Sequence, residues 1–355
     1  MEGLVADRAF WQGKKVFITG HTGFKGSWLA LWLARMGANI SGVSLPPGTH
    51  PNLFTLVRID KAVDGHYCDI RDRASLASIV HIVQPEIVLH LAAQPLVRAS
   101  YRAPVDTIST NIMGTANLLD AIRGVESVRV AVMVTTDKVY KNCERPYPYR
   151  EGDPLGGDDP YSASKAASEV VIESYRTSFL TGRGIAVASA RAGNVIGGGD
   201  WSEDRLIPDA VRAWQAGKPL HVRRPHAVRP WQHVLEPLCG YLRLTESLWE
   251  RPELADAYNF GPLTGEAVMA RDMAELARVN YGGGDIVYGN GCEGPHEARI
   301  LTLDVAKARE VLGVVPKWSL TTAVERTMRW YRRQAEGVDA STLCREDIAA
   351  YEDAQ

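Results

Sequence analysis

Short apolar runs alternate with stretches of helical periodicity through the first 190 residues of the chain. The runs that have the length and β-branched character of buried strands are 15–19, 39–44, 86–91, 128–135 and 185–190. The stretches with helical periodicity are 26–36, 105–123 and 160–180. Strands that alternate with helices predict crossover units, and therefore an α/β fold with a doubly wound parallel sheet.

The pattern becomes less regular after Gly193. Loops rich in glycine and proline separate short segments with helical periodicity, which are 206–216, 270–280, 305–312 and 321–333. Long loops in a compact protein usually carry function. We therefore interpret the second half as a smaller C-terminal lobe that binds a substrate.

Composition and charge narrow the class of protein. The 355 residues are 45% hydrophobic and carry a formal net charge of −2, which excludes wholesale disorder and offers no basic field for nucleic acid or an anionic membrane. No apolar run approaches the ~20 residues of a membrane span, and the first ten residues lack the apolar stretch of a secretion signal. The five cysteines are scattered without a CxxC pair, so we expect no metal site and a cytoplasmic location.

A glycine-rich segment follows the first strand and opens the first helix. Its spacing is Gly20-x-x-Gly23-x-x-Gly26. Glycines permit a tight turn and a close approach of the backbone to a pyrophosphate, and the helix N-terminus attracts the anion. An ordinary strand-to-helix turn is the alternative. We predict a dinucleotide-binding loop, completed by His21, Thr22, Phe24 and Lys25.

The adenosine end of such a site lacks its usual acid. Residues 20–59 contain no Asp or Glu, and the second strand ends in Ser44, whose hydroxyl can hydrogen-bond a ribose but discriminates poorly between NAD and NADP. Arg35 could meet a 2′-phosphate, although a solvated helix face is the simpler interpretation. Asp69 and Ile70, after a third strand, suit the adenine edge or a helix N-cap.

A second constellation opens the helix at 160–180. Asp159 and Pro160 are typical N-cap and first-turn residues. Tyr161 and Lys165 are then four residues apart on one helix face. A lysine ammonium, together with a positively charged nicotinamide ring, would lower the pKa of the phenol from ~10 toward neutrality. Such a tyrosine can take a proton from a sugar hydroxyl while hydride leaves.

Together these motifs resemble the extended short-chain dehydrogenase/reductase family and, within it, the nucleotide-sugar 4,6-dehydratases, most closely the CDP-glucose branch. The resemblance covers residues 10–333. Its motifs are Gly20-x-x-Gly23-x-x-Gly26, His90-Leu91-Ala92-Ala93-Gln94, Thr135-Thr136-Asp137-Lys138-Val139-Tyr140, Tyr161-x-x-x-Lys165 and Arg191-Ala192-Gly193-Asn194-Val195-Ile196-Gly197.

The resemblance implies a domain arrangement. Residues 10–193, with a returning strand and helix around 231–262, would form a Rossmann-like NAD-binding domain. The nucleotide-sugar lobe would comprise 194–230 and 263–335. Residues 336–355, with six acids and one arginine, are expected to be a solvated acidic tail.

The resemblance also implies catalytic roles. Thr136 would join Tyr161 and Lys165 in oxidising the sugar at C4. Asp137 would protonate the departing C6 hydroxyl, which requires a pKa raised by burial. The dTDP-glucose enzymes have Glu at the next position, where this chain has Lys138. That lysine would act as a neutral base at C5 or, as the alternative, as a cation that stabilises the enolate.

Cofactor and substrate contacts follow from the same resemblance. NAD would also contact Leu91, Ala92, Ala93, Gln94, Asn111 and Thr135. The substrate, CDP-glucose, would contact Gln94, Asn194, Arg205, Leu206, Arg229, His233, Asn259 and Arg299. One departure concerns a phosphate-binding arginine of the sister enzymes, whose position corresponds to Gly294; Arg299, Arg223 and His296 are candidates to replace it.

The resemblance further implies a homodimer or homotetramer that assembles through residues 105–123 and 160–180. It also implies a role in deoxysugar synthesis for bacterial surface polysaccharides, such as the O-antigen of lipopolysaccharide. Two alternatives within the fold are a dehydratase for dTDP-, GDP- or UDP-sugars and a 4-epimerase or reductase. A non-catalytic NAD sensor is the third. Asp137 and Lys138 argue against an epimerase, and the presence of both Tyr161 and Lys165 argues against a sensor.

Overall fold

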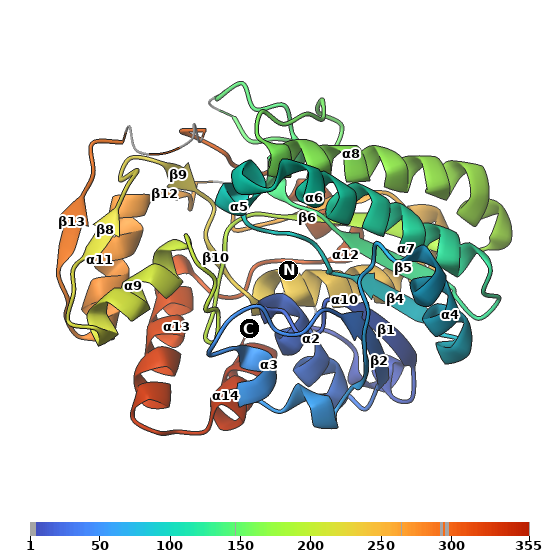
Figure 1. Cartoon of the computed structure of the whole chain (residues 1–355), viewed down its shortest axis with the longest axis horizontal. Coiled ribbons are helices and arrows are strands. Elements are labelled where there is room, and N and C mark those ends of the chain that lie inside the picture. Colours follow the sequence, from blue (N-terminus) through green and yellow to red (C-terminus); the bar gives the residue numbers. More distant parts are fainter. Residues whose placement is uncertain (1–4, 146, 264, 292–293, 295–297, 355) are drawn as a thin grey trace.

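A seven-stranded parallel sheet forms the centre of the molecule in the computed structural model, which describes residues 5–145, 147–263, 265–291, 294 and 298–354 (Figure 1). The strand order is β11-β6-β5-β4-β1-β2-β3, and every neighbouring pair is parallel. The strands are β1 (Lys15–Thr19), β2 (Asn39–Ser44), β3 (Asp64–Tyr67), β4 (Ile87–His90), β5 (Val130–Val134), β6 (Ala186–Ala192) and β11 (Ala257–Phe260). The α/β fold with a doubly wound parallel sheet is therefore confirmed.

Alternate residues of the strands bury against helices on opposite faces of the sheet. Ile18, Leu89 and Val132 share a core with α2 and α10, whereas Phe17 and Met133 pack against α4, α7 and α8. This double burial explains why the strands have almost unbroken apolar sequences. The helices are α2 (Phe24–Arg35), α4 (Arg73–Val83), α7 (Gly114–Arg123), α8 (Pro160–Tyr175) and α10 (Leu235–Glu250).

The periodic stretch at 105–123 consists of three consecutive segments, which are α6 (Pro104–Ile108), a π-helical turn over Ser109–Met113 and α7. Helix α8 likewise continues as a π-helical turn over Arg176–Leu180. Shorter segments precede or follow the strands of the nucleotide-binding half, namely α1 (Arg8–Trp11), α3 (Leu53–Leu56) and α5 (Val97–Arg102).

Most of the remaining elements form a smaller lobe at the carboxyl ends of the strands, on the left of Figure 1. Its helices are α9 (Leu206–Gln215), α11 (Ala270–Tyr281) and α13 (Leu320–Ala335), whereas α12 (Ala306–Leu312) packs beside β11 and α10 of the central sheet. Its short strands pair as β8 (Leu220–Val222) with β13 (Ile286–Tyr288), β7 (Val195–Ile196) with β10 (Gln232–His233), and β9 (Val228–Arg229) with β12 (Val268–Met269).

The prediction of a solvated tail is wrong for most of residues 336–355. Helix α14 (Ala340–Glu352) buries Leu343, Cys344, Ile348 and Tyr351. These apolar residues recur at helical spacing between the acids, so the helix docks by that face while most of its charges stay outside. The Tyr351 hydroxyl donates to Glu236 Oε2 at 2.7 Å.

In the described part of the chain, no helix is long and apolar enough to cross a bilayer. The same residues contain no cluster of three or more His, Cys, Asp or Glu side chains that could hold a metal ion.

Candidate functional site

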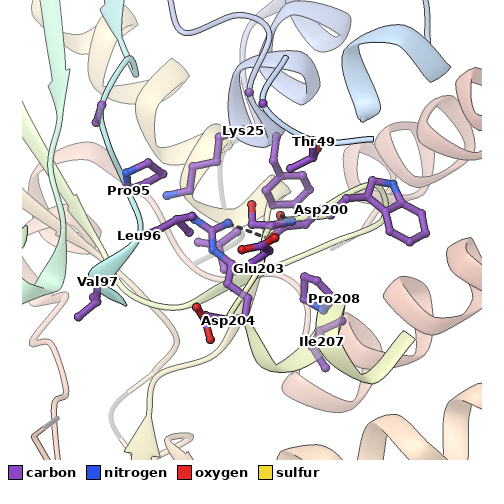
Figure 2. Close-up of a pocket in the computed structure, with 18 of the residues that line it drawn as sticks. Lys25, Thr49, Pro95, Leu96, Val97, Asp200, Glu203, Asp204, Ile207 and Pro208 are labelled. Atoms are coloured by element: carbon purple, nitrogen blue, oxygen red, sulfur yellow. Dashed lines mark hydrogen bonds and ion pairs between the residues drawn. The ribbon is translucent and has the colours of Figure 1, made fainter. Parts of the chain in front are cut away.

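A cavity of about 1410 Å³ opens between the carboxyl ends of the strands and the smaller lobe. Figure 2 shows Lys25, Leu96 and Asp200 directed into it from separate segments of the chain. The sequence-predicted residues that line it are Gly20, Thr22, Gly23, Phe24, Lys25, Gly26, Ser44, Asp69, Ile70, Leu91, Ala92, Ala93, Thr135, Thr136, Asp137, Lys138, Tyr161, Lys165, Asn194, Arg205, Leu206 and Arg229. Parallel sheets place ligands at this edge.

The glycine-rich loop has the backbone that a dinucleotide requires. Gly20 has a φ of +81°, and a Cβ there would lie 2.8 Å from the amide nitrogen of Ala92. A Cβ at Gly26 would lie 2.1 Å from the carbonyl oxygen of Gly20. Gly23 caps α2 without a side chain, so the first amides of the helix face the cavity free of side-chain capping. These residues fit a dinucleotide pyrophosphate.

Two hydroxyls lie side by side at the predicted adenosine end. Ser44 Oγ and Thr22 Oγ1 are 2.5 Å apart, and Thr22 also donates to the carbonyl oxygen of Leu45 at 2.8 Å. Asp69 lines the cavity, but its carboxylate pairs with Arg71, whose hydrogen bonds lower the pKa of Asp69. Arg35 does not line the cavity, because it pairs with Glu352 of α14 at 3.2 Å.

Tyr161 and Lys165 enter the cavity from the first two turns of α8. Asp159 caps this helix by accepting from the Ser162 amide at 2.9 Å. Burial raises the pKa of Tyr161 to about 12 and lowers the pKa of Lys165 to about 8. Lys165 Nζ donates to the Val134 carbonyl oxygen at 3.1 Å. The phenol is therefore protonated at neutral pH in the protein alone, and lowering its pKa requires positive charge added to the cavity.

Thr136, Asp137 and Lys138 follow β5 at the same edge. Thr136 Oγ1 donates to Asp137 Oδ1 at 3.0 Å, and Asp137 is only 2% exposed. Among the described residues, Asp137 Oδ2 has no hydrogen-bond partner. Burial raises the pKa of Asp137, opposed by the charge of Lys138 and by the Thr136 hydrogen bond. This is the direction that the sequence required of a proton donor.

Lys25, the cation of the glycine-rich loop, has a strongly lowered pKa that the sequence did not indicate. Burial, together with the charges of Arg205 and Lys165, lowers the pKa of Lys25 to about 7. The loop pattern identified this residue by position, but nothing in the pattern showed that its amine would be enclosed.

On the substrate side, Asn194, Arg205, Leu206 and Arg229 line the cavity. Arg205 Nη1 lies 2.8 Å from Asp200 Oδ2. Arg229 donates to the carbonyl oxygens of Val228 and Ala298 at 2.8 and 2.6 Å. Its guanidinium is therefore anchored by the neighbouring backbone.

Three predicted cofactor residues are directed away from the cavity. The His21 ring packs against Gly42 and Gly65, where an added Cβ would lie 2.6 and 2.9 Å from its nitrogens. The Gln94 amide bonds Thr107 Oγ1 at 2.9 Å, and Asn111 bonds the main chain of Gln94. The polar side-chain groups of His21, Gln94 and Asn111 thus face the scaffold in this structure, and contact of these residues with a cofactor stays a prediction.

Three predicted substrate residues are also outside the cavity lining. His233 is fully buried, with its ring centroid 6.0 Å from that of Trp28, and burial lowers its pKa to about 3. The Asn259 side chain accepts from Tyr140 at 2.7 Å. Arg299 lies 3.9 Å from Glu144. His296, the other candidate near Gly294, lies outside the described residues.

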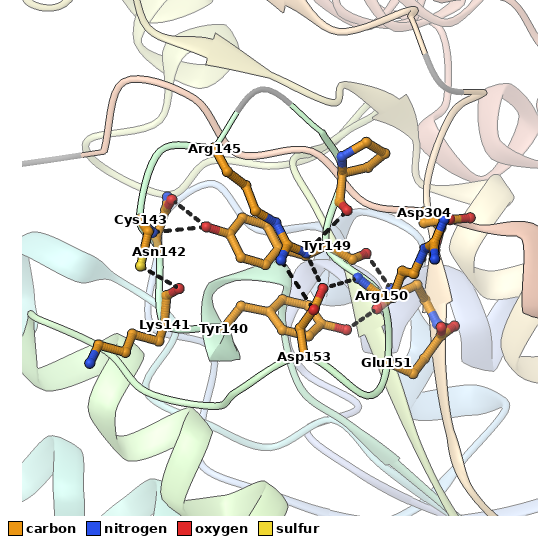
Figure 3. A network of polar contacts seen from close by, with 12 residues as sticks. Tyr140, Lys141, Asn142, Cys143, Arg145, Tyr149, Arg150, Glu151, Asp153 and Asp304 are labelled. Carbon is orange, nitrogen blue, oxygen red and sulfur yellow. Dashed lines mark hydrogen bonds and ion pairs between the residues drawn. The ribbon is translucent and has the colours of Figure 1, made fainter.

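A polar network lies in the segment that follows Lys138. Figure 3 shows the rings of Tyr140 and Tyr149, whose centroids are 5.2 Å apart, with Arg145 over Tyr149 at 4.0 Å. Arg191 bonds Tyr140 at 2.9 Å and pairs with the buried Glu169 at 2.8 Å.

Glu169 also links the network to the strand that carries the candidate catalytic residues. Its carboxylate accepts from Thr135 Oγ1 at 2.5 Å. Glu169 lies one helical turn beyond Lys165, and sequence reasoning missed it. A carboxylate on the same face of the helix as Tyr161 and Lys165 was the available signal.

Comparison with known proteins agrees with this geometry. A family model described as GDP-mannose 4,6 dehydratase matches residues 17–327. The chain is 44% identical to a CDP-glucose 4,6-dehydratase from Salmonella typhimurium, over 97% of this chain and 98% of the relative. It is 31% identical to a dTDP-glucose 4,6-dehydratase from Streptomyces antibioticus, over 89% and 92%.

A solved structure has the same architecture. It is a dTDP-glucose 4,6-dehydratase from Streptomyces venezuelae with NAD bound, with a TM-score of 0.76, 25% identity, and coverage of 92% of this chain and 99% of that one. The chain belongs to the nucleotide-sugar 4,6-dehydratases of the extended short-chain dehydrogenase/reductase family.

Proposed function

We propose that this protein is an NAD-dependent CDP-glucose 4,6-dehydratase, a hydro-lyase that forms CDP-4-keto-6-deoxyglucose. The observation that carries the reaction type is the buried Asp137, whose pKa is raised by burial, beside Thr136 and Tyr161 in a cavity bordered by a dinucleotide loop. The 44% identity over nearly the whole of both chains supports the choice of CDP-glucose.

The residues of the loop fit NAD. Gly20, Gly23 and Gly26 would admit the pyrophosphate, and Ser44 would bond the adenosine ribose. When bound, NAD accepts hydride from C4 of the sugar and returns it to C6. Because no cation follows Ser44 before His50, we expect a modest preference for NAD over NADP. Titration of the cofactor-free protein with both dinucleotides tests this, and tighter binding of NADP would contradict it.

The oxidation at C4 needs a base for the 4-hydroxyl proton. Tyr161 takes this proton as its phenolate, with Thr136 near enough to hydrogen-bond the phenol. The positive charge of Lys165 favours the phenolate, and its bond to the Val134 carbonyl fixes the amine in the cavity wall.

The elimination uses the next two residues of the chain. The 4-ketone acidifies the hydrogen on C5, which Lys138 removes through the lone pair of its neutral amine. Asp137 donates its proton to the C6 oxygen, and that oxygen leaves as water. After the hydride returns to C6, C5 takes back a proton, so the net change is the loss of one water.

Exposed apolar side chains support a homodimer or homotetramer. Val105 of α6 is 76% exposed, and Val170 of α8 is 61% exposed. Ile108, Met113 and Phe179, in α6 and in the π-helical turns at 109–113 and 176–180, are each at least 41% exposed. Apolar side chains gathered on adjacent helices are typical of an interface between subunits.

The biological setting that we propose is cytoplasmic synthesis of a deoxysugar for a bacterial surface polysaccharide, such as the O-antigen of lipopolysaccharide. The basis is the family assignment together with the absence of a membrane-spanning helix among the described residues.

Incubation with CDP-, dTDP-, GDP- and UDP-glucose tests the proposed activity. A 4-keto-6-deoxy sugar absorbs ultraviolet light in base, whereas a 4-epimer does not. We expect this absorbance to form fastest with CDP-glucose. Turnover of only another nucleotide sugar would change the substrate, and formation of a 4-epimer would refute the reaction type.

A further inference from the structure

Two arginines from distant segments converge on one carboxylate at the cavity wall. Arg98 of α5 lies 3.6 Å from Asp204 Oδ1 through its Nε, and Arg223, just after β8, lies 3.3 Å from the same oxygen through its Nη1. All three residues line the cavity. Figure 2 shows Asp204 at the same pocket as Leu96 and Val97, the residues that lead into Arg98.

The charges at this point do not balance. Among the described residues, Asp204 is the one carboxylate within 4.0 Å of either guanidinium. The two guanidiniums therefore share one carboxylate in direct contact, while Asp209, whose charge also interacts with that of Arg223, is paired with Arg212. Neither contact with Asp204 is a hydrogen bond of good geometry. Arg98 Nε is buried and lacks a hydrogen-bond partner among the described groups. Such an arrangement favours an additional anion.

The backbone is shaped to hold these side chains. Asp204 has a φ of +60°, a left-handed conformation that costs energy for a residue other than glycine. Gly294 has a φ of +76°, and a Cβ there would lie 2.5 Å from Arg98 Nη2. A glycine at 294 therefore leaves the space that the Arg98 guanidinium occupies.

We infer that Arg98 and Arg223 form a clamp for the diphosphate of the nucleotide sugar, with Asp204 holding the two guanidiniums together before substrate binds. The inference rests on the proposed function for the identity of the anion. A diphosphate offers each guanidinium two acceptor oxygens at once, which a single carboxylate oxygen at 3.3–3.6 Å does not. Arg98 is thus a substrate-binding residue that the sequence motifs did not identify.

Arg299 is a weaker candidate for this contact. It lies outside the cavity lining and faces Glu144, and its side chain is 68% exposed, against 24% for Arg98. A partly buried guanidinium that already faces the cavity loses less freedom on binding than an exposed one.

Calorimetric titration of CDP and of cytidine into the NAD-saturated protein separates the diphosphate from the base. Arg98→Gln should weaken CDP binding about ten- to hundredfold, the range for loss of a charged hydrogen bond, and leave cytidine binding unchanged. Arg102→Gln is the matched control, because Arg102 lies on the same helix outside the cavity lining. It should leave both affinities unchanged.

A second variant tests the geometry. Gly294→Ala should weaken CDP binding in the wild-type protein, because the new methyl group displaces Arg98, but have little effect in the Arg98→Gln background. Wild-type affinity of Arg98→Gln for CDP would overturn the inference. Equal losses for CDP and cytidine would overturn it too, because they would indicate a role in folding.

The test of Arg98 does not depend on which nucleotide sugar is the substrate. If the wild-type protein binds another nucleoside diphosphate in place of CDP, the proposed substrate fails. The same comparison, made with that diphosphate and its nucleoside, still supports or overturns the role of Arg98.

Discussion

Replacing Asp137 by Asn separates oxidation of the sugar from elimination of water. The amide has nearly the shape of the carboxyl group, and its oxygen can still accept the 3.0 Å hydrogen bond from Thr136. It lacks the acidic proton that the account assigns to the departing C6 hydroxyl. Tyr161 and Lys165 are unchanged, so transfer of hydride from C4 should survive.

The size of the effect follows from the environment of the carboxyl group. Asp137 is 2% exposed, and burial raises its pKa, which favours the protonated form that a general acid needs. Loss of a positioned general acid lowers a rate by about 10²- to 10⁴-fold, equivalent to about 3–5 kcal/mol of transition-state stabilisation. We expect overall turnover of Asp137→Asn to fall by this factor.

Rapid mixing with CDP-glucose provides the assay. Absorbance of the reduced cofactor should rise in Asp137→Asn and persist, while formation of the 4-keto-6-deoxy product lags. Failure to reduce the cofactor in a variant that still binds CDP would show that Asp137 serves the first step.

The Lys138→Ala variant tests the base at C5. It should slow exchange of the C5 hydrogen with solvent deuterium more than Asp137→Asn does. Exchange at the wild-type rate would leave Lys138 as a charge stabiliser.

Three other perturbations test separate parts of the account. Tyr161→Phe should lower kcat about 10²- to 10⁴-fold with CDP affinity retained, and near-normal turnover would remove Tyr161 from the base role. Burial raises the pKa of Glu236 from 4.5 to about 7. The protonated carboxyl group therefore contributes about 3 kcal/mol of stability below pH 4.5, and this contribution is lost as the pH rises through 7. The Tm advantage of wild type over Glu236→Gln should shrink over that pH range, and a constant difference would contradict this. The double variant Val105→Glu/Val170→Glu should be monomeric by light scattering. The control Val279→Glu, at a 68% exposed position of the other lobe, should keep the oligomeric state of the wild type. An unchanged oligomer in the double variant would exclude this interface.

The strands of the central sheet were predictable because their burial is visible in the sequence. Residues 130–134 are apolar throughout, since β5 is covered on both faces. Strand β3 (Asp64–Tyr67) is at the edge and carries no such signal. The two-residue pairs of the smaller lobe depend on contacts between distant segments, so local pattern did not reveal them.

Helix α14 shows where composition misled the interpretation. The six acids of 336–355 suggested a solvated end. The spacing of Leu343, Ile348 and Tyr351 was nevertheless helical, and these residues fill a space beside α2 and α13. Charge on one face of a helix does not prevent the other face from docking.

The candidate site was predictable where chemistry and backbone position coincide. The glycine-rich loop and the helix start at Tyr161 fix their residues at the cavity through local geometry. Sequence could not show that the His21 and His233 rings point into the core, because a motif gives the position of a residue but not the direction of its side chain. The meeting of Arg98 with Asp204, 106 positions later in the chain (204 − 98), likewise depends on the tertiary fold.

The central claim is an internal oxidation and reduction coupled to loss of water, and isotope transfer tests it directly. CDP-glucose carrying deuterium at C4 should give a 4-keto-6-deoxy product with that deuterium at C6 and a solvent-derived hydrogen at C5. A product that keeps the deuterium at C4 with inverted configuration, or a protein that binds NAD and CDP but moves no label, would contradict the account.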